Sequence, residues 1–275
     1  MNRIKLMAFD LDGTLLTSDK RLTERNKKAL SAAAEQGVLI VPSTGRYFSA
    51  IPEEIRNLDF VRYFLTINGA YVFNRENDEC IYSAEMSIDT AVAVMKYLDN
   101  LPVCYDCYMD NCGWMTRELQ DNAHLYTDGF YLDFLKSSRT PVPELKAFIT
   151  EHNHPIQKIS IFMKDMEVRE KASEEIRRLF PNTSVSSSVR NNMEVNDRHA
   201  NKGEALLNLA AHFGIKREEI MAFGDGGNDF DMIEAAGVGV VMGNGREDLK
   251  KIADIIAPSC DEDGVAQVIE KVLAQ

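Results

Sequence analysis

The chain has little positive charge for its size. Its 31 lysines and arginines are outnumbered by 43 aspartates and glutamates, so its formal net charge is −12. This deficit argues against nucleic acids and anionic membrane surfaces as partners, because both are bound through clustered basic side chains. An acidic protein that handles anionic phosphates must neutralise them locally, with a metal ion and a few placed cations.

Long hydrophobic runs and a disulfide pattern are also absent. No apolar stretch is long enough to span a bilayer, and no cleavable signal sequence precedes the first apolar run, so we expect a cytoplasmic protein. Cysteine occurs five times in 275 residues, an odd number that does not indicate a disulfide framework. Cys104 and Cys107, which have Cys112 nearby, lie three residues apart on an expected strand. They should face opposite ways, so a shared metal or a disulfide is not expected there.

What the sequence does contain is an alternation of strand-like and helix-like segments, which is typical of a parallel α/β sheet. Thr23 is a suitable N-cap for a helix over 24–36, and Gly37 is a suitable stop. The apolar run at 38–41 indicates a strand that is buried on both faces. Further strands are expected at 4–9, 63–67, 193–195, 220–223, 237–242 and 255–257, a hairpin at 71–82, and helices at 47–57 and 201–213.

The first apolar run ends in the sequence D-L-D-G-T at 10–14. A carboxylate that follows a buried strand lies at the carboxyl edge of the sheet, where ligands bind in open α/β folds. Asp10 could attack a phosphorus atom while Asp12 handles protons, and the pair could also hold a divalent cation. Backbone amides near Leu11 and Asp12 would point at phosphate oxygens, as in an anion nest. The competing interpretation is an ordinary Asp-Gly turn after a strand.

Two further segments offer groups that could bind phosphate. Thr44 follows the apolar run at 38–41, and its hydroxyl suits a hydrogen bond to a phosphate oxygen, while Gly45 lets the backbone approach closely. A helix N-cap explains Thr44 equally well from spacing alone. Lys202 stands at the start of an expected helix, where the helix dipole disfavours a cation unless an anion is bound nearby.

The run at 220–223 is followed by the sequence G-D-G-G-N-D at 224–229. Asp225 ends a strand as Asp10 does, and the two could form a carboxylate set for Mg²⁺, a hard cation that prefers oxygen ligands. Asn228 can donate a hydrogen bond to phosphate, and Asp229 can orient Lys202 or a water bound to the metal. A plain Asp-Gly loop is the alternative.

In this order, the segments at 10–14, 43–46, 202–203 and 224–229 resemble the four motifs of the haloacid dehalogenase (HAD) superfamily of phosphotransferases. The sequences T-I-N-G-A at 66–70, V-G-V-V-M-G-N-G at 238–245 and D-E-D-G-V-A at 261–266 are similar to the Cof-type sugar-phosphate phosphatases. The resemblance covers about residues 1–82 and 190–275, which are the amino-terminal and carboxyl-terminal parts of the chain.

The resemblance implies roles for the motif residues. Asp10 would be the nucleophile and a metal ligand, and Asp12 would act as acid and base while its backbone carbonyl reaches the metal. Lys202 would bridge the phosphate and the carboxylate of Asp10. The resemblance also favours a phosphate contact over an N-cap for Thr44. It implies a phosphate contact for Asn228.

The spacing of the motifs predicts an inserted domain. Thr44 follows Asp10 by 34 residues, but 158 positions separate Lys202 from Thr44, which is more than a crossover connection needs. We expect residues 1–82 and 191–275 to form a Rossmann-like, doubly wound, mainly parallel sheet core. Residues 83–190 are then a mixed α/β cap that determines substrate specificity, with strands at 103–109, 158–163 and 183–189 and helices after 89, near 117 and at 166–180.

The sequence therefore predicts a Mg²⁺-dependent phosphatase that hydrolyses phosphomonoesters of small metabolites, sugar phosphates in the first place, through an aspartyl-phosphate intermediate. Two alternatives stay open: a phosphomutase or phosphotransferase on the same core, and a non-catalytic protein that binds phosphorylated metabolites. The non-catalytic protein would be expected to lose Asp10, Asp12 or Lys202, and all three are present.

Overall fold

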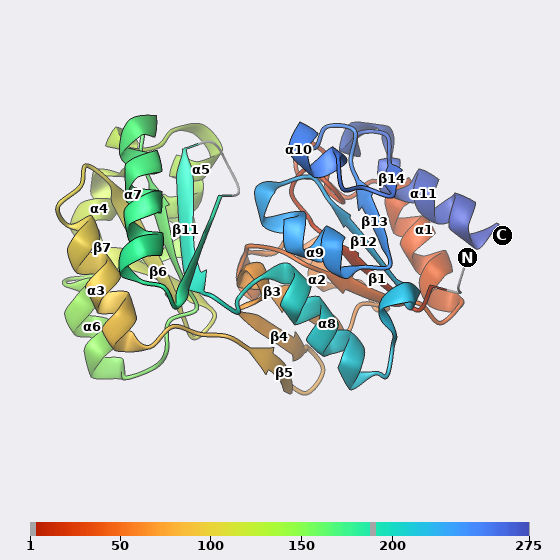
Figure 1. Cartoon of the computed structure of the whole chain (residues 1–275), viewed down its shortest axis with the longest axis horizontal. Coiled ribbons are helices and arrows are strands. Elements are labelled where there is room, and N and C mark those ends of the chain that lie inside the picture. Colours follow the sequence, from red (N-terminus) through yellow and green to blue (C-terminus); the bar gives the residue numbers. More distant parts are fainter. Residues whose placement is uncertain (1–3, 188–190, 275) are drawn as a thin grey trace. The chain divides into compact units, whose positions relative to one another are not determined.

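The computed structural model describes residues 4–187 and 191–274. The chain divides into two compact units. The first, which we call the core unit, comprises Met1–Arg46, Ile51–Ser83 and Asn201–Gln275, and the second, the inserted unit, comprises Tyr47–Ala50 and Ala84–Ala200. Figure 1 shows that each unit has its own sheet and its own helices.

The core unit is built on a parallel sheet of five strands in the order β14-β13-β12-β1-β2. Its central strands are almost entirely apolar and buried, as expected for a parallel sheet covered on both faces. The strands are β1 (Leu6–Phe9), β2 (Leu39–Pro42), β12 (Ile220–Gly224), β13 (Val238–Val241) and β14 (Ile255–Ile256). The predicted α/β fold with a mainly parallel core sheet is confirmed.

A small antiparallel sheet completes the core unit. It contains β3 (Tyr63–Thr66), β4 (Tyr71–Asn74) and β5 (Cys80–Ser83), which include the predicted hairpin. The strand expected at 63–67 therefore belongs to this second sheet. It touches the parallel sheet through a bridge between Leu65 and Ser43, which lies just beyond β2.

The helices of the core unit start and end largely where the sequence indicates. The helices are α1 (Glu24–Glu35), α2 (Glu53–Arg56), α8 (Lys202–His212), α9 (Phe230–Ala235), α10 (Glu247–Lys250) and α11 (Gly264–Leu273). The Thr23 side chain accepts a hydrogen bond from the backbone of Asn26 and so caps α1. The expected helix at 47–57 is wrong: a 3₁₀ turn and the short α2 replace it. Pro52 disfavours helical backbone in the residue before it and has no N–H for a helical bond, so the run is broken there.

The inserted unit is a six-stranded sheet in the order β10-β11-β9-β6-β7-β8. Its strands are β6 (Cys104–Met109), β7 (Cys112–Thr116), β8 (Arg139–Val142), β9 (Lys158–Phe162), β10 (Thr183–Ser186) and β11 (Asn192–Asp197). Its helices are α3 (Ile88–Leu98), α4 (Arg117–Asp121), α5 (Gly129–Ser138), α6 (Leu145–His152) and α7 (Met166–Leu179). The sheet is antiparallel except for the pair β7–β8.

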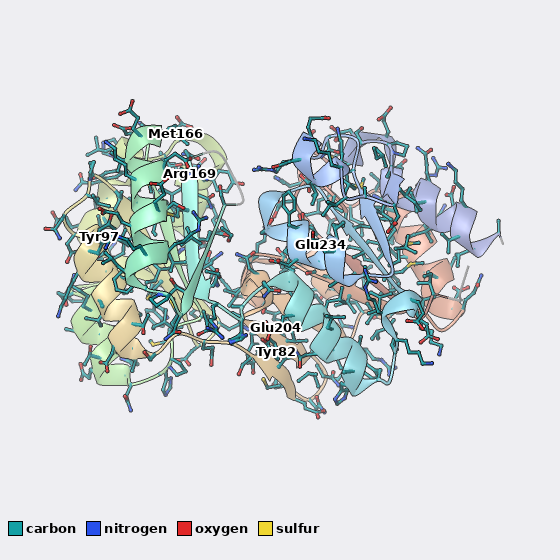
Figure 2. All side chains as sticks on the ribbon, viewed as in Figure 1. Tyr82, Tyr97, Met166, Arg169, Glu204 and Glu234 are labelled. Carbon is teal, nitrogen blue, oxygen red and sulfur yellow. The ribbon has the colours of Figure 1, made fainter. Side chains whose placement is uncertain are left out.

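One face of this sheet packs against α3, α6 and α7 in a shared apolar core. Figure 2 labels Tyr97 on α3 and Arg169 on α7, and both make contacts that fix these helices. Tyr97 donates a hydrogen bond to Glu175 of α7 at 2.6 Å, and Arg169 donates to the backbone carbonyl of Asn192 at 3.0 Å.

The last junction between the units, after Ala200, differs from the expected boundary after residue 190. Strand β11 pairs with β9 and β10, so residues 191–200 belong with the inserted unit, and the core unit resumes at Asn201. The pattern of a short strand cannot show which sheet it joins, because pairing partners are set by tertiary contacts. Residues 188–190, which include the expected boundary and the end of the strand expected at 183–189, lie outside the described residues.

The cysteines of β6 face opposite sides of the inserted sheet, as their spacing predicts. Cys107 lies in the apolar core with the helices named above, and Cys104 lies in a separate cluster with Met115 and Phe162. All five cysteines are free thiols. Among the helices of the described residues, none is both long and apolar enough to cross a membrane.

Asn26 joins three distant segments of the core unit. Its side chain is fully buried, donates to the Leu15 carbonyl at 3.1 Å and accepts from the Ala266 backbone at 3.0 Å. Replacing Asn26 by alanine should lower the free energy of unfolding of this unit by about 2–4 kcal/mol, because two buried backbone groups lose their partners. Thermal unfolding of the full chain measures the effect. Asn208→Ala is the control, since Asn208 is exposed and bonds only within its own helix. Equal midpoints for both variants would contradict the assignment.

Candidate active site

The motifs predicted to form the site meet at the carboxyl edge of the parallel sheet of the core unit. Asp10 directly follows β1, Thr44 lies two residues beyond β2, and Asp225 directly follows β12. The three strands are neighbours, with Phe9 aligned with Phe223 on one side and with Pro42 on the other. The register therefore brings three segments that are far apart in sequence to one place, where open α/β folds bind ligands.

A buried lysine lies between two of the carboxylates. Lys202, the first residue of α8, is fully buried, and its Nζ atom lies 2.6 Å from Oδ1 of Asp10 and 2.7 Å from Oδ1 of Asp229. Burial alone would lower the pKa of Lys202, but the two carboxylates outweigh it and raise that pKa, so the side chain stays charged. A cation at this helix start is stable because it is paired, which resolves the conflict with the helix dipole.

Asp10 is only 6% exposed. Its pKa is raised well above its ordinary value, in the first place by burial and then by the nearby carboxylates of Asp229, Asp225 and Asp12, against the opposing charge of Lys202. The backbone N–H of Asp10 donates to the Phe223 carbonyl at 2.9 Å, which continues the ladder of β1 by one residue. The residue therefore has a fixed backbone and a side chain whose charge depends on its neighbours.

Asp225 and Asp229 stand on the loop that follows β12. Oδ2 of Asp229 accepts two backbone hydrogen bonds, from Asp225 at 2.9 Å and from Gly226 at 2.8 Å, so it holds the loop closed. Thr14 donates to Oδ1 of Asp225 at 2.7 Å, which ties this loop to the turn after β1. Burial, followed by the charge of Asp229, raises the pKa of Asp225 to about 6.

Oxygen atoms of Asp10, Asp225 and Asp229 lie within 4.8 Å of one another. Three hard oxygen donors grouped in this way suit a divalent cation such as Mg²⁺. The resemblance implies Asp10, Asp225 and the backbone carbonyl of Asp12 as ligands and places Asp229 outside them. The structure groups the carboxylate of Asp229 with those of Asp10 and Asp225. The carboxylate of Asp12 has other partners, which leaves its backbone carbonyl as the expected ligand atom.

The Asp12 carboxylate is held by two cations. Arg46 donates from Nε to Oδ2 at 2.8 Å and from a terminal nitrogen to Oδ1 at 2.7 Å, and Nζ of Lys20 lies 3.0 Å from Oδ1. Burial would raise the pKa of Asp12, but Arg46 and Lys20 together hold it below its ordinary value. The sequence leaves Arg46 open as a helix cap or a substrate contact, and its pairing with Asp12 is a finding of the tertiary structure.

The loop after β2 is fixed by backbone contacts. Thr44 is almost fully buried; its hydroxyl accepts a hydrogen bond from the Arg46 backbone at 3.2 Å, and its carbonyl accepts one from the Asn68 backbone at 3.0 Å. A methyl group on Gly45 would come within 2.8 Å of Oδ1 of Asn68, so a larger residue there would have to displace the Asn68 side chain. Leu11 is buried in the neighbouring turn, where its carbonyl accepts from Leu16 at 2.8 Å.

Asn68 is a site residue that sequence reasoning does not single out. Its side-chain oxygen accepts a hydrogen bond from Asn228 at 3.0 Å, so it joins the loops that follow β3 and β12. Its backbone has φ 58°, in the left-handed region that asparagine tolerates better than most residues. An Asn-Gly pair directly after a strand is the signal that could have identified it.

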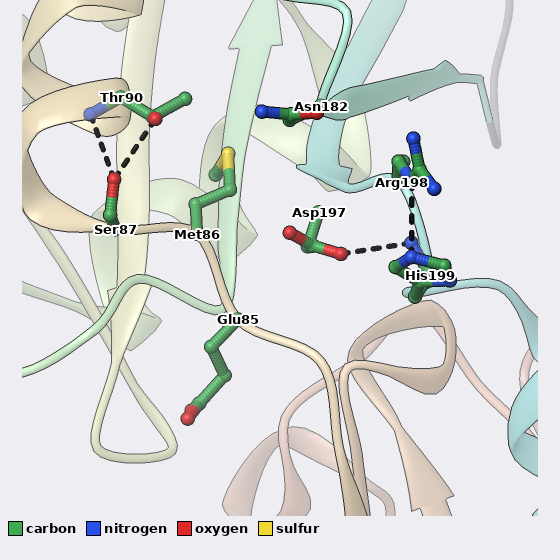
Figure 3. A pocket seen from close by; sticks show the side chains of 8 residues that line it. All are labelled: Glu85, Met86, Ser87, Thr90, Asn182, Asp197, Arg198 and His199. Atoms are coloured by element: carbon green, nitrogen blue, oxygen red, sulfur yellow. Dashed lines mark hydrogen bonds between the residues drawn. The ribbon is translucent and has the colours of Figure 1, made fainter.

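The inserted unit contains a separate cavity of about 490 Å³. Figure 3 shows its lining near the start of α3 and the end of β11, where Asp197 accepts from the His199 backbone and Arg198 donates to the His199 ring. None of the predicted site residues lines this cavity. The predicted site residues all lie in the core unit.

The comparisons with known proteins agree with this site. The family model of the haloacid dehalogenase-like hydrolases matches residues 7–269. Phosphatase YwpJ of Bacillus subtilis (strain 168) is 32% identical over 98% of this chain and 100% of its own length. The 5-amino-6-(5-phospho-D-ribitylamino)uracil phosphatase YcsE of the same organism is 30% identical over 97% of this chain and 94% of its own. The solved structure of the HAD subclass IIB sugar phosphatase BT4131 matches with a TM-score of 0.80 at 25% identity, covering 97% of this chain and 98% of its own.

A parallel sheet that carries a nucleophile candidate, a buried lysine and an acidic loop at one edge defines an α/β phosphoryl-transfer enzyme. The chain belongs to the family of haloacid dehalogenase-like hydrolases, and it is a phosphatase of the HAD type, a hydrolase of phosphoric monoesters. The resemblance to the Cof-type branch that the sequence motifs indicate is confirmed.

Asp229→Asn should lower kcat/KM about 10- to 100-fold, because the loss of the charge that pairs with Lys202 leaves that cation free to shift. Phosphate release from a generic aryl phosphate measures the effect. The control is Asp254→Asn, a carboxylate that also accepts a backbone hydrogen bond, from Gly239 at 2.8 Å, but at the amino end of the same sheet. Full activity in the Asp229 variant would show that this contact has no part in catalysis.

Proposed function

We propose that this phosphatase hydrolyses phosphomonoesters of small metabolites, sugar phosphates in the first place, through an aspartyl-phosphate formed on Asp10. The observation that carries the proposal is the position of the Asp10 carboxylate. It follows β1, an interior strand of the parallel sheet, and lies 2.6 Å from the buried Nζ atom of Lys202. A carboxylate held beside a fixed cation can accept a phosphoryl group, since the cation offsets the negative charge that gathers there.

A metal ion fits the same edge of the sheet. Asp10, Asp225 and Asp229 supply three carboxylates against the single charge of Lys202, and we propose that Asp10 and Asp225, with Asp229 or the backbone carbonyl of Asp12, would hold Mg²⁺. When bound, the ion would neutralise charge on the phosphate and help to orient it.

The proposed reaction has two steps. In the first, an oxygen of Asp10 bonds to phosphorus and the bond to the leaving-group oxygen breaks, while Asp12 gives that oxygen a proton. In the second, Asp12 takes a proton from water, whose oxygen attacks the phosphorus of the aspartyl-phosphate and releases inorganic phosphate and free Asp10. The ion pairs of Asp12 with Arg46 and Lys20 favour its charged form, which the second step requires. The first step uses the protonated form, which has to be reached against these two cations.

Several neighbours would bind the phosphate oxygens. We propose contacts from the hydroxyl of Thr44, the amide of Asn228, the ammonium group of Lys202 and the backbone amides of Leu11 and Gly45. What supports them is the position of Leu11, Thr44, Gly45 and Asn228 in the loops after β1, β2 and β12, and the 2.6 Å contact between Nζ of Lys202 and Asp10. Asp229 would keep Lys202 in place.

The names of the relatives support a polyhydroxylated leaving group. One relative acts on a 5-phospho-D-ribitylamino compound, and one structural neighbour is a sugar phosphatase. We propose that the inserted unit is a cap that contacts this leaving group and so determines specificity. We also propose a cytoplasmic location with free small metabolites as partners, which the five free thiols support, since free thiols are typical of reducing compartments.

Asp10→Asn should abolish turnover, because an amide is a poor nucleophile and a poor metal ligand. The measurement is phosphate release from a panel of phosphorylated sugars with Mg²⁺ and with a chelator, where only the metal-containing wild-type reaction should proceed. Acid-quenched wild-type enzyme should carry phosphate on Asp10. Asp19→Asn, the same change at an exposed residue, is the control. Substantial turnover by the Asp10 variant would overturn the nucleophile assignment, and a strict need for a sugar bisphosphate would indicate a phosphomutase instead.

Replacing residues 84–200 by a short flexible linker should leave a core that still releases phosphate from an aryl phosphate, weakly. Its discrimination among phosphorylated metabolites should largely disappear, because the proposed phosphate contacts are common to all of them. A cooperative thermal transition is the control for folding. If the folded core kept the substrate ranking of the full chain, specificity would not reside in the inserted unit.

A further inference from the structure

We infer that Arg46 is a positioning residue for this reaction: its planar guanidinium fixes the orientation of the Asp12 carboxylate. The inference rests on the proposed role of Asp12 as acid and base. It adds a residue for which the sequence motifs give no role, and it assigns that residue to orientation rather than to substrate binding.

The contact between the two side chains has a geometry that restrains rotation. Two nitrogens of Arg46 donate to the two oxygens of Asp12, at 2.8 and 2.7 Å, so the guanidinium and carboxylate planes are locked together. Lys20 reaches only one oxygen, at 3.0 Å, and an ammonium group is a point charge that does not define a plane. The contact holds both carboxylate oxygens of Asp12, a side chain that is 28% exposed.

Arg46 itself is held on both sides along the chain. Its backbone N–H donates to Thr44 at 3.2 Å, and its carbonyl accepts from Ile67 at 3.0 Å. The next residue, Tyr47, belongs to the inserted unit; it is 4% exposed and donates from its hydroxyl to the Ser138 carbonyl at 2.7 Å. The clamp on Asp12 therefore stands where the chain passes from one unit to the other, between two anchored segments.

Orientation matters because one oxygen of Asp12 has to meet the leaving-group oxygen. An acid that is free to rotate loses much of its effect, and a misplacement of about 1 Å can reduce a rate about 100-fold. The need is greatest for an alkyl phosphate, whose leaving alkoxide is strongly basic, and least for an aryl phosphate, which leaves readily without a proton. A loss of the correct Asp12 orientation should therefore reduce the rate with an alkyl phosphate more than the rate with an aryl phosphate.

The experiment compares kcat/KM for glycerol phosphate and for 4-nitrophenyl phosphate in the full-length enzyme with Mg²⁺. Arg46→Met should reduce kcat/KM about 10- to 100-fold for the alkyl substrate and far less for the aryl substrate. Arg46→Lys keeps the positive charge but not the paired nitrogens that bind both oxygens of Asp12, so it should restore only a small part of the lost kcat/KM. Lys20→Met, which removes an equal charge from the same carboxylate, is the matched control and should show a much smaller loss.

A double-mutant cycle separates action through Asp12 from an independent role. In an Asp12→Ala background, Arg46→Met should add almost nothing. Additive losses, equal losses on both substrates, or full rescue by Arg46→Lys would overturn the inference. Asp12→Ala must itself lose more kcat/KM on the alkyl than on the aryl substrate. If it does not, the proposed acid role of Asp12 is wrong, and the inference about Arg46 is wrong as well. If Asp12→Ala lost more activity on the alkyl than on the aryl substrate but Arg46→Met did not, the inference about Arg46 would be refuted, while the proposed acid role of Asp12 would stand. Thermal unfolding of each variant confirms that it is folded.

Discussion

The active edge of the core unit depends on one buried cation. Lys202 has no exposed surface and is paired with Asp10 and Asp229, residues that are 192 and 27 positions away in the sequence. An unpaired charge in this environment would be strongly destabilising, so the helix start, the end of β1 and the loop after β12 must stay together. The same interaction therefore holds the fold at its sheet edge and places a positive charge next to the candidate nucleophile.

Negative charge still exceeds positive charge at this edge. Burial and mutual repulsion raise the pKa values of Asp10 and Asp225, and the three grouped carboxylates outnumber the single lysine. A divalent cation and a phosphate would complete the set, the first by offsetting the carboxylates and the second by pairing with the cations. In a protein with a net charge of −12, this local arrangement explains how an anionic substrate can be bound at all.

The two units are separate in structure. The core unit holds every predicted site residue, whereas the inserted unit has its own apolar core and its own sheet. The chain crosses between the units after Arg46, whose guanidinium binds Asp12, and again after Ala50, after Ser83 and after Ala200. A group that orients the acid and base thus lies at a junction, where it is anchored by contacts in the core unit and by the burial of Tyr47.

The sequence alone determined the parts of this protein that depend on local patterns. Buried strands such as β1 and β12 appear as apolar runs, α1 and α8 begin at capping residues, and each motif follows its strand, so the fold class and the motif order could be predicted. Only the tertiary structure decided the pairings: Arg46 with Asp12, Asn68 with Asn228, and β11 with the inserted sheet. These contacts join residues that are distant along the chain. They depend on strand register and on packing, which local propensity and spacing do not encode.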